Sequence, residues 1–147
     1  MNKHLEKKLV EKYPKLFRDY NESATKSCMA FGCECGDGWY KLINELFGKI
    51  TAACPETVLL QVKEKFGLLR IYVSCGTDEV YDMIDEYEDM SGHICEGCGE
   101  PGECLPDGGW LTTLCDKCRG NGIKKPADNI ELADSMMEAL GFHRVEK

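Results

Sequence analysis

Residues 58–74 read VLLQVKEKFGLLRIYVS, and their apolar side chains recur at every second position, as is typical of β-strands. Residues 64–67 interrupt the alternation and are expected to turn the chain. One face of the resulting β-hairpin is expected to be aliphatic, formed by Val58, Leu60, Val62, Leu69, Ile71 and Val73. The other face is expected to carry Gln61, Lys63, Arg70 and Tyr72.

Helical patterns lie on both sides of this hairpin. Residues 39–50, WYKLINELFGKI, place apolar side chains on one stripe, with Asp37 as the expected N-cap. A short amphipathic helix is expected over residues 3–13, and Thr77 is expected to cap an acidic helix. A last helix is expected from Asp128 to Leu140. The pattern predicts an α+β fold in which a small antiparallel sheet packs on helices.

The 147 residues are enough for one core with a small appendage. We expect an α+β core domain over 1–92 and a linker with a final helix over 121–147. Between them, residues 93–120 hold two CxxC motifs, at 95–98 and 115–118, which predict a zinc ribbon. No apolar run approaches the ~20 residues that a membrane span needs. The N-terminal residues show no export signal, so the expected location is the cytosol.

The net charge of −8 is unevenly distributed along the chain. Residues 1–76 hold 12 Lys or Arg against 9 Asp or Glu, whereas residues 77–147 hold 6 against 17. An acidic chain is poorly suited to nonspecific binding of duplex DNA, which depends on neutralising phosphates. We therefore expect neither a membrane nor a nucleic acid as partner.

The strongest chemical signal is a pair of CxxC motifs. Cys95 and Cys98 precede Cys115 and Cys118 with sixteen residues between the pairs, a spacing typical of a tetrahedral Zn²⁺ site. Four thiolates leave no position for water or substrate, so the metal is expected to be structural. An iron centre with the same ligands, two chance CxxC pairs and a disulfide framework are the alternatives. Cys104 and His93 are expected to be bystanders.

Five further cysteines match no common metal site by their spacing: Cys28, Cys33, Cys35, Cys54 and Cys75. We interpret them as buried thiols that behave as small hydrophobic residues. A second metal site is one alternative, and a reactive Cys35 with a lowered pKa, just before a helix, is another. The three histidines form no recognisable catalytic motif, and no phosphate-binding glycine loop is present. We expect no enzymatic activity.

The polar hairpin face offers a candidate ligand site. Lys63, Lys65 and Arg70 are cationic, and together with aromatic rings they suit the phosphate and base of a nucleotide. The rings expected to stack are those of Tyr72, Trp39 and Tyr40. The alternative is an ordinary solvated hairpin face with Trp39 in the core.

Three motifs together resemble a known family. ECGDGWYKLI at 34–43, QVKEKFGLLRIY at 61–72, and CEGCGEPG at 95–102 with GGWLTTLC at 108–115 resemble a widespread family of small phage and prophage zinc-ribbon proteins of uncharacterised function. Its members often have His as the last ligand, where this chain has Cys118. The resemblance implies an accessory protein of the bacterial cytosol that binds a host component.

Two functions follow as expectations. The first is a non-enzymatic protein that sequesters a host molecule, namely a phosphate-bearing nucleotide signal of bacterial immunity. The second is an adaptor or inhibitor that binds a host protein through the acidic helix between Asp78 and Asp89. A homodimer is expected because the hairpin has an edge strand that needs covering. The last helix offers further apolar residues to a second copy: Ile130, Met136, Met137, Leu140 and Phe142.

Overall fold

The computed structural model describes residues 1–21 and 27–120, so the helix predicted after Asp128 and its apolar face lie outside the described residues. The described chain is α+β, as predicted. Its helices are α1 (Lys3–Lys12), α2 (Tyr40–Ala53), α3 (Asp78–Ser91) and α4 (Asp116–Gly120), with 3₁₀ turns η1 (Cys28–Phe31) and η2 (Asp37–Trp39). Its strands are β1 (Cys33–Glu34), β2 (Val58–Lys65), β3 (Leu68–Ser74), β4 (Glu103–Asp107) and β5 (Trp110–Leu114).

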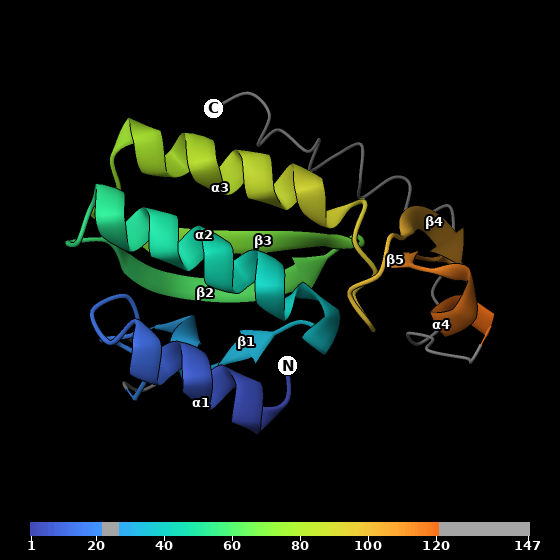
Figure 1. The fold of residues 1–147 in the computed structure, drawn as a ribbon, viewed down its shortest axis with the longest axis horizontal. Coiled ribbons are helices and arrows are strands. Elements are labelled where there is room, and N and C mark those ends of the chain that lie inside the picture. The colour runs from blue at the N-terminus through green and yellow to red at the C-terminus, as the bar shows by residue number, and fades with distance from the viewer. Residues whose placement is uncertain (22–26, 121–147) are drawn as a thin grey trace.

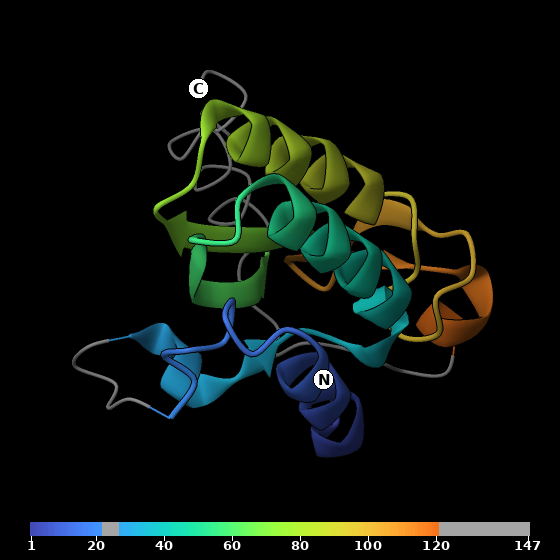
Figure 2. The ribbon, with the colours of Figure 1, turned by 60° about the vertical axis from the view of Figure 1, so that its left-hand side comes forward.

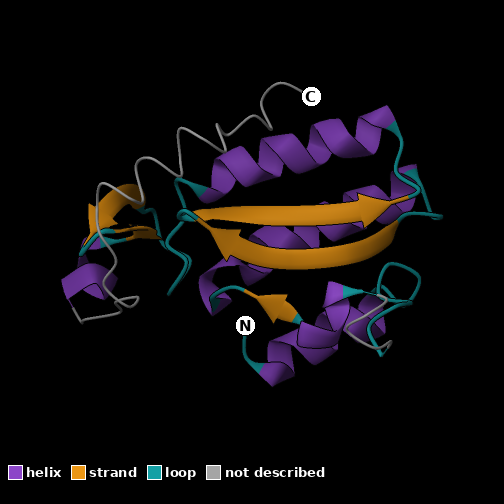
Figure 3. Cartoon of the chain, turned by 180° about the vertical axis from the view of Figure 1, so that it is seen from behind, coloured by secondary structure: helices purple, strands orange, loops and turns teal. Residues whose placement is uncertain are grey.

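The strands form two separate sheets. β1, β2 and β3 lie in that order, with β1 parallel and β3 antiparallel to β2, and β4 pairs with β5. Helices α2 and α3 lie side by side over one side of the β2–β3 hairpin (Figures 1 and 2). Seen from behind, the two strands lie in front of α2, α3 lies along the edge of β3, and no described α-helix covers the face that points to the viewer (Figure 3). No described helix has the length and apolar character needed to cross a membrane.

The predicted hairpin is confirmed, but the side-chain alternation in β2 differs from the prediction. The register with β3 shifts between Leu59 and Gln61, so that one extra residue reverses the faces of the preceding positions. Leu59 and Val62 are fully buried, whereas Leu60 is only half-buried. The prediction that Leu60 belongs to the aliphatic face is wrong because of this bulge.

Capping at the start of the predicted helices differs between α2 and α3. Thr77 caps α3 as predicted, because its side chain accepts a hydrogen bond from the backbone N–H of Val80. Asp37 does not cap α2. Its carboxylate instead accepts hydrogen bonds from the backbone and the side-chain amide of Asn2, at 2.7 and 2.9 Å. Asp37 therefore joins the N-terminal segment to the loop that precedes α2.

The outer edge of β3 is covered by α3 of the same chain. Ser91 Oγ accepts a hydrogen bond from the Leu69 N–H at 2.9 Å, and Glu88 Oε2 accepts one from the Ile71 N–H at 2.7 Å. These two side chains satisfy backbone groups that an exposed edge strand would offer to another chain. The expectation that this edge needs a second copy is wrong, and the predicted homodimer loses that argument.

The hydrogen bond between Glu88 of α3 and the edge of β3 can be tested by substitution. Glu88→Ala is expected to lower the free energy of unfolding by about 1–3 kcal/mol, because the buried N–H of Ile71 loses its acceptor. Urea denaturation measures the change. Glu86→Ala, an exposed acid on the same helix, is the matched control and should stay within about 0.5 kcal/mol. Equal losses in the two variants would contradict this role of Glu88.

Candidate metal centre

The four cysteines of the CxxC pairs form one cluster. The Sγ atoms of Cys95, Cys98, Cys115 and Cys118 all lie within 4.8 Å of one another, and those of Cys98 and Cys115 are 3.7 Å apart. A tetrahedral Zn²⁺ ion with Zn–S bonds of about 2.3 Å places its sulfur atoms about 3.8 Å apart. None of the ten cysteines is in a disulfide. The prediction that these four residues come together is confirmed; they could hold one metal ion, and the spacing suits a tetrahedral one.

The pKa values of the thiols in the cluster shift in opposite directions. Burial raises the pKa of Cys95, but backbone N–H groups of Cys115, Cys98 and Gly97 outweigh it and lower the pKa to about 7. The Cys118 thiol shows the opposite shift, since its hydrogen bond with the Cys95 side chain, together with burial, raises its pKa to about 12. Four negative charges at this separation need a cation among them, so the donor set fits a bound metal.

Each half of the cluster sits on a different element. Cys95 and Cys98 lie in the turn that follows α3, where the Gly99 N–H bonds to the Cys95 carbonyl at 2.9 Å. Cys115 follows β5, and Cys118 lies on α4. A metal held by both pairs therefore ties the segment after α3 to the β4–β5 hairpin. Cys104 and His93 are outside the cluster, as predicted.

The first metal-binding turn is packed against the loop that starts α2. The Gly38 N–H donates to the Glu96 carbonyl at 2.8 Å, and the Gly36 N–H donates to Glu96 Oε2 at 2.9 Å. A Cβ atom at position 38 would lie 2.6 Å from the Gly99 nitrogen. Only glycine allows so close an approach of two backbones. The CGDGW and CEGCG motifs are thus the two sides of one contact, which the sequence analysis missed.

A second contact joins the ribbon to the turn of the β2–β3 hairpin. Phe66 and Gly67 both have positive φ, at 55° and 84°, as a two-residue hairpin turn requires. Thr113 Oγ1 of β5 donates to the Gly67 carbonyl at 2.5 Å, and Cys104 Sγ lies 3.8 Å from the Phe66 carbonyl oxygen. The metal-binding ribbon is therefore attached to the core at two separated places.

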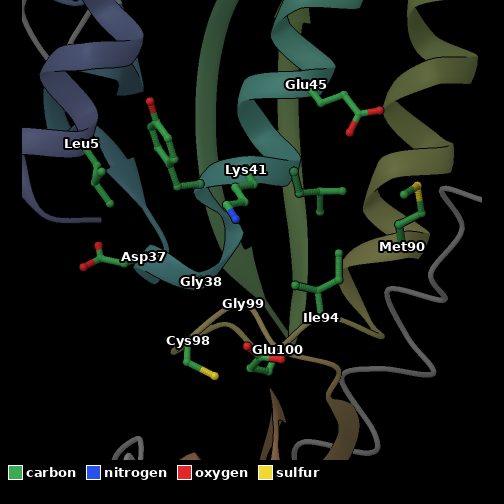
Figure 4. A pocket seen from close by; sticks show the side chains of 12 residues that line it. Leu5, Asp37, Gly38, Lys41, Glu45, Met90, Ile94, Cys98, Gly99 and Glu100 are labelled. Carbon is green, nitrogen blue, oxygen red and sulfur yellow. The ribbon is translucent and has the colours of Figure 1, made fainter.

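A pocket of about 430 Å³ lies beside the metal site (Figure 4). The start of α2, the end of α3 and the first metal-binding turn surround it. Its wall includes the metal ligand Cys98 and the predicted ring Tyr40. The other lining residues are Leu5, Asp37, Gly38, Lys41, Leu42, Glu45, Met90, Ile94, Gly99 and Glu100. None of the predicted hairpin ligands lines this pocket, so Tyr40 is separated from them.

The structure brings four of the six predicted ligand residues onto one face of the hairpin. Lys63 pairs with Arg70, Gln61 pairs with Tyr72, and Lys65 follows two positions after Lys63. The Tyr72 ring is 45 % exposed, and both lysines are half-buried. Burial lowers the pKa of Lys65, and the nearby positive charges of Lys63 and Arg70 lower it further.

Arg70 is less accessible than expected. Only 6 % of its surface is exposed, so the alternative of an ordinary solvated hairpin face is wrong at this position. Burial lowers the pKa of the guanidinium group, while the charges of Tyr72, Asp89 and Glu64 act in the opposite direction. The neighbouring carboxylates make a buried cation tolerable.

Trp39 is not available to stack on a ligand. It is fully buried, and its ring N–H donates to the Ile94 carbonyl at 2.9 Å. The expectation of a stacking role for Trp39 is wrong because its ring is enclosed in the core, where its N–H is bonded to the segment before Cys95.

The reactive-thiol interpretation of Cys35 is also wrong. Burial, followed by the charge of Cys33, raises the pKa of Cys35 well above its usual value. Burial likewise raises the pKa of Cys33 to about 12. Both thiols belong to the core, as the interpretation of buried free cysteines predicts. That interpretation is wrong for Cys75, which is exposed, and only partly right for Cys28 and Cys54, which are half-buried.

No protein-family model, curated protein or solved structure matches this chain. The residues and their arrangement therefore carry the functional argument.

Proposed function

We propose that this is a non-enzymatic binding protein, stabilised by a structural Zn²⁺ ion, that takes a phosphate-bearing nucleotide on the outer face of the β2–β3 hairpin. The observation that carries the proposal is the gathering of three cations on this face. Lys63 and Arg70 are direct strand partners, and both lower the pKa of Lys65 through their charge. An anion bound among them would relieve this repulsion.

The same face offers a ring to a base. Tyr72 is the exposed residue of β3 and lies opposite Gln61. A half-exposed ring next to cations suits stacking with a nucleobase, while the amide of Gln61 can exchange hydrogen bonds with it. Lys63 and Lys65 supply the phosphate contacts, and Arg70 contributes its charge from a buried position. The resemblance to small phage proteins extends the proposal to a host nucleotide signal that the protein sequesters.

The structural role of the metal is compatible with this assignment. All four candidate metal ligands are cysteines of the protein, and such a site is closed to substrate. The ribbon contacts the hairpin turn through Thr113 and Gly67. The metal would therefore maintain the geometry of the end of the hairpin that carries Lys65.

The proposal is tested by calorimetric titration of zinc-loaded protein with cyclic dinucleotides, cyclic mononucleotides and ADP-ribose. Lys63→Gln combined with Lys65→Gln is expected to weaken binding at least about tenfold, because each charge-assisted hydrogen bond contributes about 1.5–3 kcal/mol. Raising the salt concentration should weaken wild-type binding. Lys117→Gln, at an exposed position of α4, is the control and should bind as wild type. Unchanged affinity in the double variant would exclude the hairpin face.

A second candidate function rests on the surface of α3. Five of its acidic residues are exposed, namely Asp78, Glu79, Asp82, Glu86 and Asp89. This surface suits a basic host protein, which would make the chain an adaptor or inhibitor. Asp82→Asn with Glu86→Gln would then abolish the biological effect, whereas the double lysine variant would retain it. The nucleotide-binding proposal requires the opposite result from the same pair of variants.

A further inference from the structure

Two cysteines meet at the end of the molecule opposite the metal centre. Cys54 follows the last residue of α2, and Cys75 lies between β3 and α3 (Figure 1). The Cys54 thiol donates a hydrogen bond to the Cys75 carbonyl oxygen at 3.4 Å. Twenty residues separate the two cysteines in the sequence, so the fold brings them together. Neither cysteine belongs to the metal cluster.

The two residues are close enough for a local rearrangement to join them in a disulfide. A carbonyl oxygen lies about 3 Å from the Cβ of its own residue, so the Cys54 sulfur is at most about 6.5 Å from the Cβ of Cys75. In a disulfide the sulfur of one cysteine lies about 3 Å from the Cβ of the other. Rotation of the Cys54 side chain and movement of the connection between β3 and α3 would close this difference. Thr57 Oγ1 also lies 3.5 Å from the Cys75 carbonyl oxygen and can hold it afterwards.

The backbone at Cys75 adds an independent observation. Its φ is 60°, which lies in the left-handed region. Residues other than Gly, Asn and Asp seldom adopt this conformation. Gly76 follows directly and would adopt this conformation without strain. The left-handed position is nevertheless occupied by a residue with an exposed thiol. Strain of this kind often accompanies a functional requirement.

We propose that Cys54 and Cys75 form a redox modification site, in which a hydroperoxide links the end of α2 to the β3–α3 connection through a disulfide. Cys75 is exposed and Cys54 is half-buried, so the oxidant reaches Cys75 first. The site is independent of the proposed nucleotide-binding face, because neither thiol comes from residues 61–72.

The chemistry takes two steps. The Cys75 sulfur attacks one peroxide oxygen, an S–O bond forms, the O–O bond breaks, and the other oxygen leaves as water with the thiol proton. The Cys54 sulfur then attacks the sulfur of this sulfenic acid. An S–S bond forms, the S–O bond breaks, and the hydroxyl leaves as a second water with the Cys54 proton. Two thiols are thereby oxidised by two electrons, and one hydrogen peroxide is reduced to two waters.

The test is peptide mapping of the full-length, zinc-loaded protein after treatment with a slight molar excess of hydrogen peroxide and alkylation of the remaining thiols. Combined cleavage by trypsin and by a Glu-specific protease isolates Cys54 in residues 50–56 and Cys75 in residues 71–79. We expect these two peptides to be joined, and dithiothreitol to separate them. The link should raise Tm by about 5–10 °C, because it closes a loop of about 20 residues.

Three variants complete the experiment. Cys28→Ser removes a half-buried thiol outside the metal cluster and should leave both the linked peptide and the rise in Tm unchanged. Cys75→Ser should remove both. Cys75→Gly should also remove both, while its reduced form is at least as stable as wild type because glycine accepts a φ of 60°. Recovery of both peptides fully alkylated, or links that involve only the metal ligands, would overturn the proposal.

Discussion

Cys118→Ala is expected to lower the free energy of unfolding by at least about 3 kcal/mol, since loss of a metal ligand is among the most destabilising changes in small domains. The expected loss is large because Cys118 and Cys95 lie on different elements of the fold. Cys118 lies on α4, whereas Cys95 lies against the core next to Ile94. Without the fourth ligand, the β4–β5 hairpin loses its tie to the segment after α3.

Two measurements check this prediction together. Elemental analysis should show that the variant loses bound zinc, and urea denaturation should show the lower stability. Chelator-treated wild type should resemble the variant. Cys104→Ala is the matched control, because Cys104 lies in the same ribbon but outside the cluster; it should retain the metal. A stable Cys118→Ala variant with full metal content would show that three thiolates suffice.

Gly38→Ala should have the second large effect, a loss of about 2–4 kcal/mol. The added Cβ atom would lie 2.6 Å from the Gly99 nitrogen and 2.7 Å from the Glu96 carbonyl carbon. These are backbone atoms of the metal-binding turn, which a bound metal holds in place. The loop and the turn must therefore separate, and the Gly38 N–H loses its bond to the Glu96 carbonyl.

Gly48→Ala is the matched control for this substitution. Gly48 lies inside α2, where its added Cβ atom would meet only the Tyr13 hydroxyl oxygen, at 3.4 Å. Alanine is favoured over glycine in a helix by about 1 kcal/mol, so this variant should gain stability. Replacing glycine with alanine is thus expected to lower the free energy of unfolding at position 38 and to raise it at position 48, ten residues further on. Loss of stability at both positions would show that the loss at Gly38 does not depend on the contact with the metal-binding turn.

Trp39 fluorescence distinguishes separation of the turn from general unfolding. In a Trp110→Phe background Trp39 is the remaining tryptophan, and its ring is fully buried with its N–H on the Ile94 carbonyl. We expect a red shift in Gly38→Ala and in chelated wild type under conditions where the far-ultraviolet circular dichroism is unchanged. An unshifted emission would mean that the ring stays in place when the turn is disturbed.

Local patterns predicted the secondary structure because each pattern depends on neighbours along the chain. The period of two in residues 58–74 and the helical stripe in residues 39–50 correspond to β2, β3 and α2. The paired CxxC motifs predicted the metal cluster for the same reason. Each pair needs only a tight turn, and four clustered thiolates have few chemical uses other than holding a metal.

The ligand residues were less predictable because their accessibility depends on distant parts of the chain. Trp39 is an aromatic residue beside a glycine loop, and the fold buries its ring and joins its N–H to the carbonyl of the distant Ile94. The bulge at Leu60 depends on the pairing of β2 with β3. The coverage of the β3 edge depends on Glu88 and Ser91, two polar residues of α3 whose hydrogen bonds to the strand follow from no pattern within the helix.

The amino-acid sequence by itself determined the strands, the main helices and the four cysteines that could hold a metal, since hydrophobic period and short cysteine spacing are local properties. The tertiary structure alone decided that residues 36–38 and 95–99 form one contact, and that Cys54 lies against Cys75. These pairs are 21 to about 60 residues apart in the sequence. Their proximity results from packing the whole core, which no local pattern encodes.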